Sequence, residues 1–552
     1  MAEAKPDDPR PLVLLALLAA AAFCWAAVGY SFESGNHEVY LLDPLRRAGL
    51  ATFAGDPFVT GTLQYHGLFS LIAAGLYKVN AAGAGFLTIF VALLAATVWA
   101  WWRLCRSLGG GVVAFLTSVI AYHVLLGDRA LGFYSILQDG QFNAGNVAAV
   151  ALVVGIALWL ERRIVWAGLA FGVAGAFHLN YAVVCPMLWL ALVVLRGRAD
   201  AATEVAGSGA VRTRDFRRGV VGTVAALLPS MLNVAFALPA KLGASNDNAL
   251  PLGRFVELYV ELRHPHHYQP LAWPWWVWLA FLLPIPLAVL AWRRHRGERP
   301  WNDAATIWLL LMGLQLVALL FAGVFYVSET AIQMSLWRFS PHAKLLAVTG
   351  ATIGLLQGGA AVTARPVLRR VATQLPLILL MLGAAIARFA FVGTGPIGQS
   401  PPDTRMLEAA AWARTYTDRD ALFLVPPGAG SAFPVNARRG HVVSFKLVPQ
   451  LSGELAGWES RLRDVLAVDD LSPYAGGLTG YATAQRRMDE RYGALSADRL
   501  FAVATARGAA YMLTLKPLAD APSRSEIWRG EAGAAIYDVR VRPAFVSDDP
   551  AD

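Results

Sequence analysis

The sequence predicts a polytopic α-helical membrane protein of about eleven transmembrane helices, followed by a soluble C-terminal α/β domain. Its 552 residues are 56% hydrophobic and only 15% charged, with a mean hydropathy of +0.48. Water-soluble domains carry about 25% charged residues, so a soluble enzyme of this size is excluded. Long apolar runs recur through residues 1–392, and the chain changes character at residue 393, where a Gly/Pro/Ser-rich linker begins.

The net charge of +9 belongs to the membrane part of the chain. Residues 1–392 hold 29 Lys and Arg against 19 Asp and Glu, whereas residues 393–552 hold 18 against 19. Short cytoplasmic loops of membrane proteins are enriched in Lys and Arg, which accounts for this excess. We therefore expect no nucleic-acid partner.

Eleven apolar runs are long enough to cross a bilayer. They lie at residues 11–30, 83–102, 108–126, 142–160, 164–178, 180–195, 219–240, 272–292, 304–326, 343–362 and 373–392. With the N-terminus inside, the inside segments carry 19 Lys and Arg and the outside segments carry eight, as the positive-inside rule requires. The apolar stretch 66–79 is shorter and ends near Lys78, so we expect it to lie flat at the interface.

The first apolar run, from Pro11 to about Tyr30, is longer than the roughly 7–15 apolar residues of a cleaved signal, so it predicts an uncleaved anchor. This orientation places the N-terminus in the cytoplasm and the domain 393–552 in the periplasm. Ala-rich helices and a preference for Arg over Lys suggest a bacterium. The expected location is therefore the bacterial inner membrane, with residues 1–392 as the transmembrane domain.

Short apolar segments predict three buried strands in the C-terminal domain, at residues 421–425, 441–446 and 509–515. The first is followed by Pro426-Pro427-Gly428, which is a turn signal. Helical patterns are expected over 404–417 and 482–507. None of the three cysteines falls in this domain, which excludes a disulfide framework there.

The long first outer loop (residues 31–82) contains the strongest catalytic candidates. Glu33 and Glu38 have no local capping role, so either is a candidate general base or metal ligand. Asp43 and Asp56 each precede a proline, which also fits a helix cap or a turn, but Asp56 is kept as a catalytic candidate. His37 and His66 are further candidates in this loop.

Basic residues in other outer segments predict an anion site. The segment ELRHPHHYQP brings together Arg263, His266 and His267, and both residue types donate hydrogen bonds to phosphate oxygens. Metal binding by the histidines or a solvated loop are the alternatives. Arg338 and His178 are expected to face the same anion. Asp128 is the preferred carboxylate of the second outer loop, because Asp139-Gly140 indicates a turn.

The overall layout resembles the GT-C superfamily of integral-membrane glycosyltransferases. The resemblance rests on one anchor helix, a large acidic first loop, ten further spans and a terminal outer domain; in the loop, Glu33, Glu38, Asp43-Pro44 and Gly55-Asp56-Pro57 carry it. It implies that a sugar moves from a polyprenyl-phosphate-linked donor to a lipid, glycan or protein acceptor at the outer face. It also implies that a first-loop carboxylate serves catalysis, and that the ELRHPHHY segment and Arg338 face the lipid-linked phosphate.

Two other functions stay open from the sequence: a non-catalytic membrane assembly partner, or a transporter of a lipid-linked or anionic substrate. Transporters often show paired repeats, whereas here no repeat is evident and the polar residues collect at one face. No motif for ATP or nicotinamide binding is present. A divalent metal (Mg²⁺ or Mn²⁺) is left open as a cofactor, as are the sugar, the acceptor and the oligomeric state; membrane lipid is an expected partner.

Overall fold

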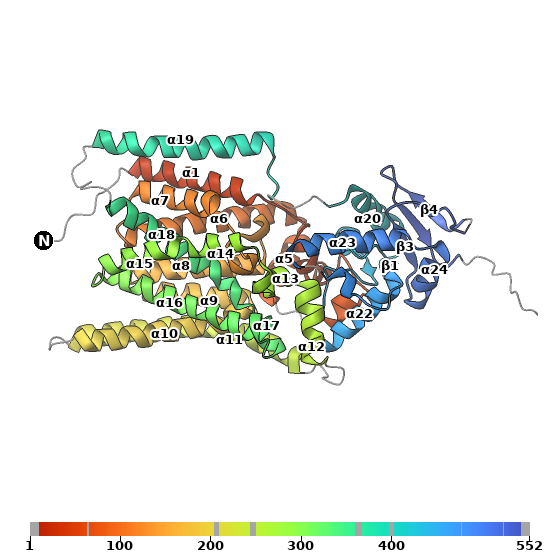
Figure 1. Cartoon of the computed structure of the whole chain (residues 1–552), viewed down its shortest axis with the longest axis horizontal. Coiled ribbons are helices and arrows are strands. Elements are labelled where there is room, and N and C mark those ends of the chain that lie inside the picture. Colours follow the sequence, from red (N-terminus) through yellow and green to blue (C-terminus); the bar gives the residue numbers. More distant parts are fainter. Residues whose placement is uncertain are drawn as a thin grey trace, which may run out of the picture.

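The computed structural model describes residues 10–62, 66–203, 209–242, 250–358, 367–396, 402–475, 477–522 and 524–541. Long helices lie side by side along the long axis of the molecule, and a region with a small sheet caps one end of them (Figure 1). The predicted class, a polytopic helical membrane protein with a C-terminal α/β part, is confirmed.

Helices lie at all eleven predicted spans. They are α1 (Arg10–Val28), α6 (Ala82–Ser107), α7 (Val112–Ile120) with η1 (Ala121–Leu125), α8 (Ala144–Leu160), α9 (Ile164–Phe177), α10 (Leu179–Thr203), α11 (Gly209–Leu242), α14 (Trp275–Leu282) with α15 (Pro284–Arg294), α16 (Arg299–Leu319) with η6 (Leu320–Val324), α18 (Ser340–Gly358) and α19 (Val367–Phe391). Within the described residues, seven spans are long and apolar enough to cross a membrane, or eight if a bent pair ending in α8 counts as one. The number of crossings therefore stays a prediction.

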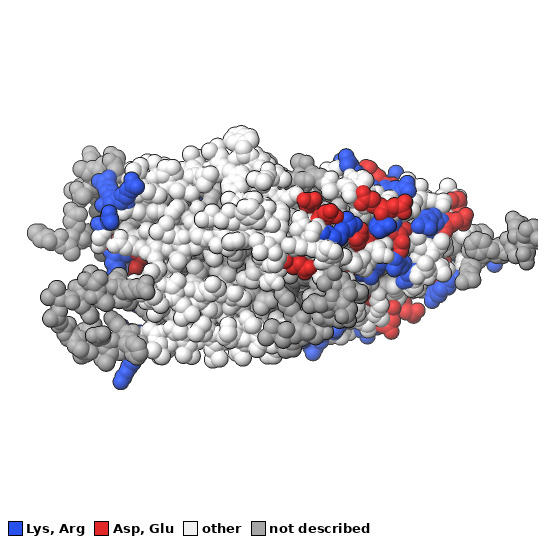
Figure 2. Space-filling view, turned by 60° about the horizontal axis from the view of Figure 1, so that its bottom comes forward, with Lys and Arg blue, Asp and Glu red and all other residues white. Residues whose placement is uncertain are grey.

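Charges are distributed unevenly along the molecule (Figure 2). A broad belt of uncharged residues separates a mainly basic end from the C-terminal end, where both signs are mixed. The basic end includes the turn between α15, which ends at Arg294, and α16, which begins at Arg299. An uncharged belt is what a bilayer requires of the surface that it contacts.

The short helix α9 is held in the bundle by close backbone contact with α11. A Cβ added at Gly168 would clash with the backbone of Gly222, and one at Gly172 with the carbonyl of Ala225. Small residues allow such approach, and helix association in membranes depends on it. The glycines of α9 thus explain how a helix of only 14 residues is packed firmly beside a 34-residue one.

Short helices form the end of the bundle that faces the C-terminal region. The first loop contains α2 (His37–Tyr40), α3 (Leu42–Arg47), α4 (Pro57–Gly61) and α5 (Gly67–Lys78), and later loops contain η2 (Leu131–Phe133), η3 (Gln138–Gly140), α12 (Leu252–Phe255), η4 (Val256–Arg263), α13 (Pro265–Tyr268), η5 (Pro270–Ala272), α17 (Glu329–Gln333) and η7 (Leu336–Phe339). The stretch 66–79 is helical as α5, and its position at a membrane interface stays a prediction.

The C-terminal region is a five-stranded sheet with helices packed on it. Its elements are α20 (Thr404–Tyr416), β1 (Leu422–Leu424), η8 (Ala429–Ala432), α21 (Phe433–Ala437), β2 (Gly440–His441), α22 (Ser452–Leu466), η9 (Ser472–Tyr474), α23 (Gly477–Gly493), α24 (Ala497–Ala506), β3 (Tyr511–Thr514), β4 (Glu526–Arg529) and β5 (Ala535–Asp538). The strand order is β2-β1-β3-β5-β4, in which β2, β1 and β3 are parallel and β5 runs antiparallel to both neighbours.

Two of the three predicted strands are confirmed as β1 and β3. The strand predicted at 441–446 pairs only at its start, because the amide of Phe445 donates to the carbonyl of Pro427 and the chain has left the sheet there. Strands β4 and β5 were not predicted. Residues 397–401 of the predicted linker and residues 542–552 lie outside the described residues.

The first loop attaches the C-terminal region to the helices. Arg419 donates to the carbonyl of Gly49, and the Thr52 hydroxyl donates to the carbonyl of Arg419 at 3.1 Å. A buried hydrogen bond joins Asp56 to His441, with 2.7 Å between Oδ2 and Nδ1. The first loop, the segment around Arg263 and the C-terminal region therefore lie at the same end of the molecule, as the sequence predicts.

Candidate functional site

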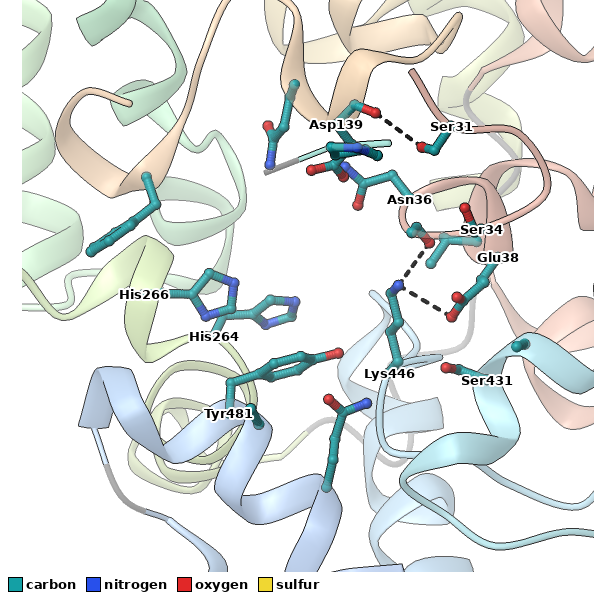
Figure 3. A pocket seen from close by; sticks show the side chains of 18 of the residues that line it. Ser31, Ser34, Asn36, Glu38, Asp139, His264, His266, Ser431, Lys446 and Tyr481 are labelled. Carbon is teal, nitrogen blue, oxygen red and sulfur yellow. Dashed lines mark hydrogen bonds and ion pairs between the residues drawn. The ribbon is translucent and has the colours of Figure 1, made fainter. Parts of the chain in front are cut away.

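A cavity of about 2580 Å³ lies where the C-terminal region meets the end of the helices. Its lining comes from α1, from both halves of loop one, from the segments 123–139, 178–180, 259–268 and 330–338, from α19, and from the C-terminal region. Residues that are far apart in the sequence thus share one space. Figure 3 shows part of it, with loop-one side chains facing His264, which precedes α13, and His266 of α13 across the opening.

Glu38 is the predicted catalytic carboxylate that lines this cavity. It lies on α2, is only 7% exposed, and has its Oε2 atom 3.2 Å from Nζ of Lys446. The same ammonium donates to the carbonyl of Gly35 at 2.7 Å (Figure 3). Burial alone would lower the pKa of Lys446, but facing negative charge, Glu38 above all, holds that pKa above its usual value. The pair is therefore a carboxylate and a charged ammonium.

Arg263 supplies a second cation to the cavity. Its guanidinium donates to the carbonyl of Lys446 at 2.8 Å and lies over the rings of Tyr481 and Phe445, 4.8 and 5.6 Å from their centres. The residue is 6% exposed, and its Nε atom has no hydrogen-bond partner within the described residues. A buried N–H group without a partner is costly, and an anionic ligand in the cavity would supply the missing acceptor.

Arg338, which was predicted with Arg263, is the third cation that lines the cavity. Its guanidinium lies over the ring of Tyr134, 4.6 Å from the ring centre. The hydroxyl of Tyr134 is in turn 2.6 Å from the hydroxyl of Ser335. Arg338 therefore has a fixed position on the wall, and a guanidinium that stacks on an aromatic ring can still donate from its edge to an anion.

The predicted histidines of the 264–267 segment also line the cavity, but they are neutral at pH 7. Burial lowers the pKa of His267 to about 3 and puts the pKa of His266 well below its ordinary value. His267 contacts the carbonyl of Gly132 through Nδ1 at 2.7 Å and stacks on Tyr134. Positive charge for an anion therefore comes from the arginines and the lysine, while a neutral histidine offers one N–H.

His178 and His66 lie together on another part of the same wall, with ring centres 5.0 Å apart. His178 follows α9, and its Nδ1 accepts a hydrogen bond from the amide of Asn180 at 3.3 Å. Burial lowers the pKa of His66 to about 3, so this residue is also neutral. Asp128 lines the cavity as well. All five residues predicted to bind phosphate, and two of the three further candidates, thus face one space.

Three predicted candidates do not line the cavity. Glu33 has a left-handed backbone (φ 53°), and its carboxylate accepts a hydrogen bond from the Tyr77 hydroxyl at 2.8 Å. His37 is fully buried, with its two ring nitrogens bonded to the amide of Glu33 and the carbonyl of Phe142. These contacts hold the turn that presents Glu38, so both residues have a local structural role.

Asp56 is the third predicted candidate that does not line the cavity, and both oxygens of its carboxylate accept hydrogen bonds from neighbouring residues. Oδ1 accepts from the amides of Phe58 and Val59, which makes Asp56 the N-cap of α4. Oδ2 accepts from the amide and the ring of His441 at 3.0 and 2.7 Å. The side chain is fully buried. Asp56 therefore joins the first loop to the C-terminal region.

Many cavity residues escaped the sequence prediction, among them Asp139, Lys446 and Tyr481. Asp139 has the left-handed conformation (φ 61°) that its Asp-Gly turn predicts, yet it also lines the cavity. Lys446 and Tyr481 come from the C-terminal region, 183 or more residues beyond their neighbour Arg263. A lysine at the end of an apolar segment is the one available signal, and it indicates the end of a strand equally well.

A divalent metal does not fit the cavity as well as an anion does. Within the ranges that the structure describes, no three His, Cys, Asp or Glu side chains are grouped so as to hold a metal ion. The histidines that lie close together, His266 and His267, are flanked by Arg263 rather than by carboxylates. No catalytic step is therefore assigned to a metal.

Comparisons with known proteins give limited similarity. Residues 404–465 match a domain of unknown function, DUF6798. No curated protein matches the chain. The chain is similar to the solved structure of the archaeal oligosaccharyltransferase AglB from Archaeoglobus fulgidus in complex with an inhibitory peptide and a dolichol-phosphate, at 11% identity and a TM-score of 0.49, covering 92% of this chain and 69% of that one.

Two further solved structures show comparable similarity. The Archaeoglobus fulgidus oligosaccharyltransferase in complex with Zn and sulfate has 13% identity and a TM-score of 0.45, over 90% of this chain and 67% of that one. The arabinofuranosyltransferase AftD from Mycobacteria has 15% identity and a TM-score of 0.47, over 96% of this chain and 40% of that one. At such values the similarity concerns the course of the chain, so function is argued from the cavity.

Proposed function

We propose that this protein is a membrane glycosyltransferase that moves a sugar from a polyprenyl-phosphate-linked donor to an acceptor hydroxyl. The observation that carries the proposal is a single cavity in which the carboxylate of Glu38 is grouped with the cations of Arg263, Arg338 and Lys446. A carboxylate can accept the proton of an attacking hydroxyl, and cations can stabilise a departing phosphate.

Apolar residues of two long helices in the cavity lining support a lipid-linked donor. They are Phe23, Ala26 and Ala27 of α1 and Ala384 and Val392 in and just after α19, where Arg388 also lines the cavity. These two helices pack against each other at the edge of the bundle (Figure 1). An isoprenoid chain has no polar groups, so it favours this lining, while its phosphate would lie in the chamber that contains the arginines.

In the proposed reaction the acceptor, the donor and the cavity residues each have a defined role. The acceptor oxygen forms a bond to the anomeric carbon of the donor sugar as Glu38 takes the proton of the hydroxyl. The bond between the anomeric carbon and the phosphate oxygen breaks, and its electron pair leaves with the polyprenyl phosphate. Arg263, Arg338 and Lys446 offset the charge that develops on that oxygen.

The proposed orientation places the cavity at the outer face of a bacterial inner membrane and residues 393–552 in the periplasm. The basic end of the molecule (Figure 2) would then face the cytoplasm, in agreement with the positive-inside rule. Polyprenyl phosphates are confined to the bilayer. A cavity lined both by the helices and by the C-terminal region suits a donor that enters from the bilayer and an acceptor that arrives from the aqueous side.

A transfer assay with matched variants tests the proposal. Purified protein is incubated with radiolabelled polyprenyl-phosphate sugars and a mixture of lipid, glycan and peptide acceptors, and label transfer is measured. Glu38→Gln is expected to reduce transfer at least about 100-fold, and Glu298→Gln, which changes an exposed carboxylate outside the cavity, serves as the control. Unchanged transfer in Glu38→Gln contradicts the role of the base. Absence of transfer with every donor favours a non-catalytic partner.

A further inference from the structure

The ammonium of Lys446 is the point where the C-terminal region enters the proposed catalytic site. It contacts two loop-one groups, the carbonyl of Gly35 at 2.7 Å and Oε2 of Glu38 at 3.2 Å. The Lys446 side chain is 16% exposed, so this pair lies largely away from bulk water. Attraction between charges is stronger in such surroundings than at an open surface.

The backbone around Lys446 is fixed by contacts from several elements. The amide of Phe445 donates to the carbonyl of Pro427 at 2.8 Å, and the indole of Trp458 donates to the carbonyl of Ser444 at 3.0 Å. Arg263 donates to the carbonyl of Lys446 itself. The lysine is therefore presented to the cavity from a rigid support, and Arg263 and Lys446 are neighbours on one wall.

This wall contains donors that an anion would use. An ammonium has three N–H groups, and among the described residues two of them are used by Gly35 and Glu38, which leaves the third for a ligand. The Nε atom of Arg263 has no partner within the part of the chain that the structure describes. The carboxylate of Glu38 opposes an incoming phosphate, because the two like charges would share the same ammonium.

We propose that Glu38 and the phosphate of the ligand compete for Lys446. In the empty site Lys446 holds Glu38 in the ion pair; when a phosphate binds to Arg263 and Lys446, the ion pair weakens and the carboxylate becomes available to the acceptor hydroxyl. Lys446 thus binds the phosphate and, by leaving Glu38, releases the base only when the donor is present. This inference rests on the proposed function for the identity of the base.

Binding measurements test the competition without any sugar transfer. The probe is farnesyl phosphate, titrated into the purified full-length protein and followed by tryptophan fluorescence, with farnesol as the control that lacks the phosphate. Glu38→Gln removes the competing charge, so it is expected to tighten farnesyl phosphate binding about tenfold, which corresponds to the loss of one opposing charge interaction. Lys446→Gln is expected to weaken it by a similar factor, and Lys446→Arg to retain most of it.

The double variant Glu38→Gln/Lys446→Gln separates competition from a general effect of each change. The competition predicts that Glu38→Gln gives no tightening once Lys446 is absent, because there is then no ammonium to release. Glu298→Gln is the matched control, since this carboxylate is 60% exposed and does not line the cavity, and it is expected to leave the affinity unchanged.

Each outcome decides the inference. Unchanged or weaker binding of farnesyl phosphate and of inorganic phosphate to Glu38→Gln overturns it, even if Lys446→Gln fails to fold. Tightening with farnesyl phosphate alone supports a lipid phosphate as the ligand, and equal tightening with inorganic phosphate supports a free phosphate. If transfer occurs but Glu38→Gln binds no more tightly, only the competition is wrong. If the competition holds and no donor supports transfer, only the proposed function is wrong.

Discussion

The two halves of the first loop use the same residue type in opposite ways. Residues 31–40 border the cavity and present Glu38, whose charged partner is Lys446. Residues 41–62 pack against the C-terminal region and contain Asp43 and Asp56, whose oxygens are occupied by two arginines and by backbone amides and a histidine. A carboxylate whose oxygens all accept hydrogen bonds from neighbouring residues stabilises the fold. A carboxylate that faces a cavity and is paired with one cation can take part in catalysis.

The difference arises from the residues on the C-terminal side of each acid. Asp56 precedes Pro57, and proline at the first helical position favours an N-cap before it. Asp43 has Arg46 and Arg47 at helical spacings of three and four residues. Glu38 has no such local partner, so its contact comes from a lysine 408 residues away.

The largest expected effect is on catalysis by the cavity half of the loop. Glu38→Gln should lower kcat/KM for sugar transfer by about 10²–10⁴-fold, because a glutamine cannot accept the hydroxyl proton. The melting temperature should change little, since the side chain borders a cavity. A glutamine variant that unfolds more easily but retains its transfer rate per folded molecule would remove the distinction between the two halves.

The next effect is on stability, in the packed half. Asp56→Ala should destabilise the protein by about 3 kcal/mol, since it removes a helix cap and leaves His441 buried without its partner. Thermal unfolding of the detergent-solubilised protein, followed by intrinsic fluorescence at a fixed heating rate, measures it. Asp56→Asn keeps the cap and is the milder control. An unchanged melting temperature in Asp56→Ala contradicts the joining role.

A smaller effect is expected from the cations. Arg263→Gln should raise KM for the polyprenyl-phosphate donor about tenfold, because one charge-assisted contact to phosphate is lost. Arg46→Gln is the matched control, since this arginine is 48% exposed and bonded to Asp43 in the packed half. Steady-state kinetics with varied donor concentration distinguish the two. Equal KM values in the two variants would mean that Arg263 supports only the fold.

The smallest effect is a pH dependence of stability. It comes from Asp489, a partly buried carboxylate of the C-terminal region that has no bonded cation within the described residues. Asp489 accepts from the amides of Gly428 and Ala429, yet burial raises its pKa from 3.8 to about 6. The folded state therefore binds a proton that the unfolded state releases between these values. The contribution of Asp489 to stability should rise as the pH falls from 7 to 5, by less than about 3 kcal/mol, whereas buried neutral histidines such as His66 and His267 lower the total stability over the same range.

Asp489→Asn tests that assignment because an amide does not titrate. The melting temperature of the variant should fall further between pH 7 and pH 5 than that of the parent protein, because the variant lacks the stabilising protonation of Asp489. Neighbouring Asp403 has a lowered pKa, chiefly from its bond to Arg405, so it stays ionised in this window. Identical pH profiles would show that Asp489 does not set this part of the stability curve.

Local patterns in the sequence predicted the helical class and the strands β1 and β3. Long apolar runs are typical of membrane-spanning helices, and a short apolar segment before Pro426-Pro427-Gly428 is typical of a buried strand. They missed β4, whose residues alternate between half-buried and exposed and include Glu526 and Arg529. The end of the segment 441–446 was placed in the sheet wrongly. Its apolar residues are buried against the cavity wall and Trp458 instead.

For the candidate site, residue types in the sequence predicted several of the side chains that line the cavity, but not which of them contact one another. Arg263, His266, His267, Arg338 and His178 were chosen as donors for an anion, and all line the cavity. The sequence does not show burial, so it could not reveal that these histidines are neutral or that Glu33 is bonded to Tyr77. It also could not bring Lys446 to Glu38, since that contact depends on the docking of the whole C-terminal region.

The most direct test of the central claim is an experimental map of the full-length protein with farnesyl phosphate bound. The account predicts phosphate density within hydrogen-bonding distance of Arg263 and Lys446, with the farnesyl chain between α1 and α19 and the Lys446–Glu38 distance longer than 3.2 Å. Phosphate density at the basic end of the molecule, or outside the cavity altogether, would contradict it.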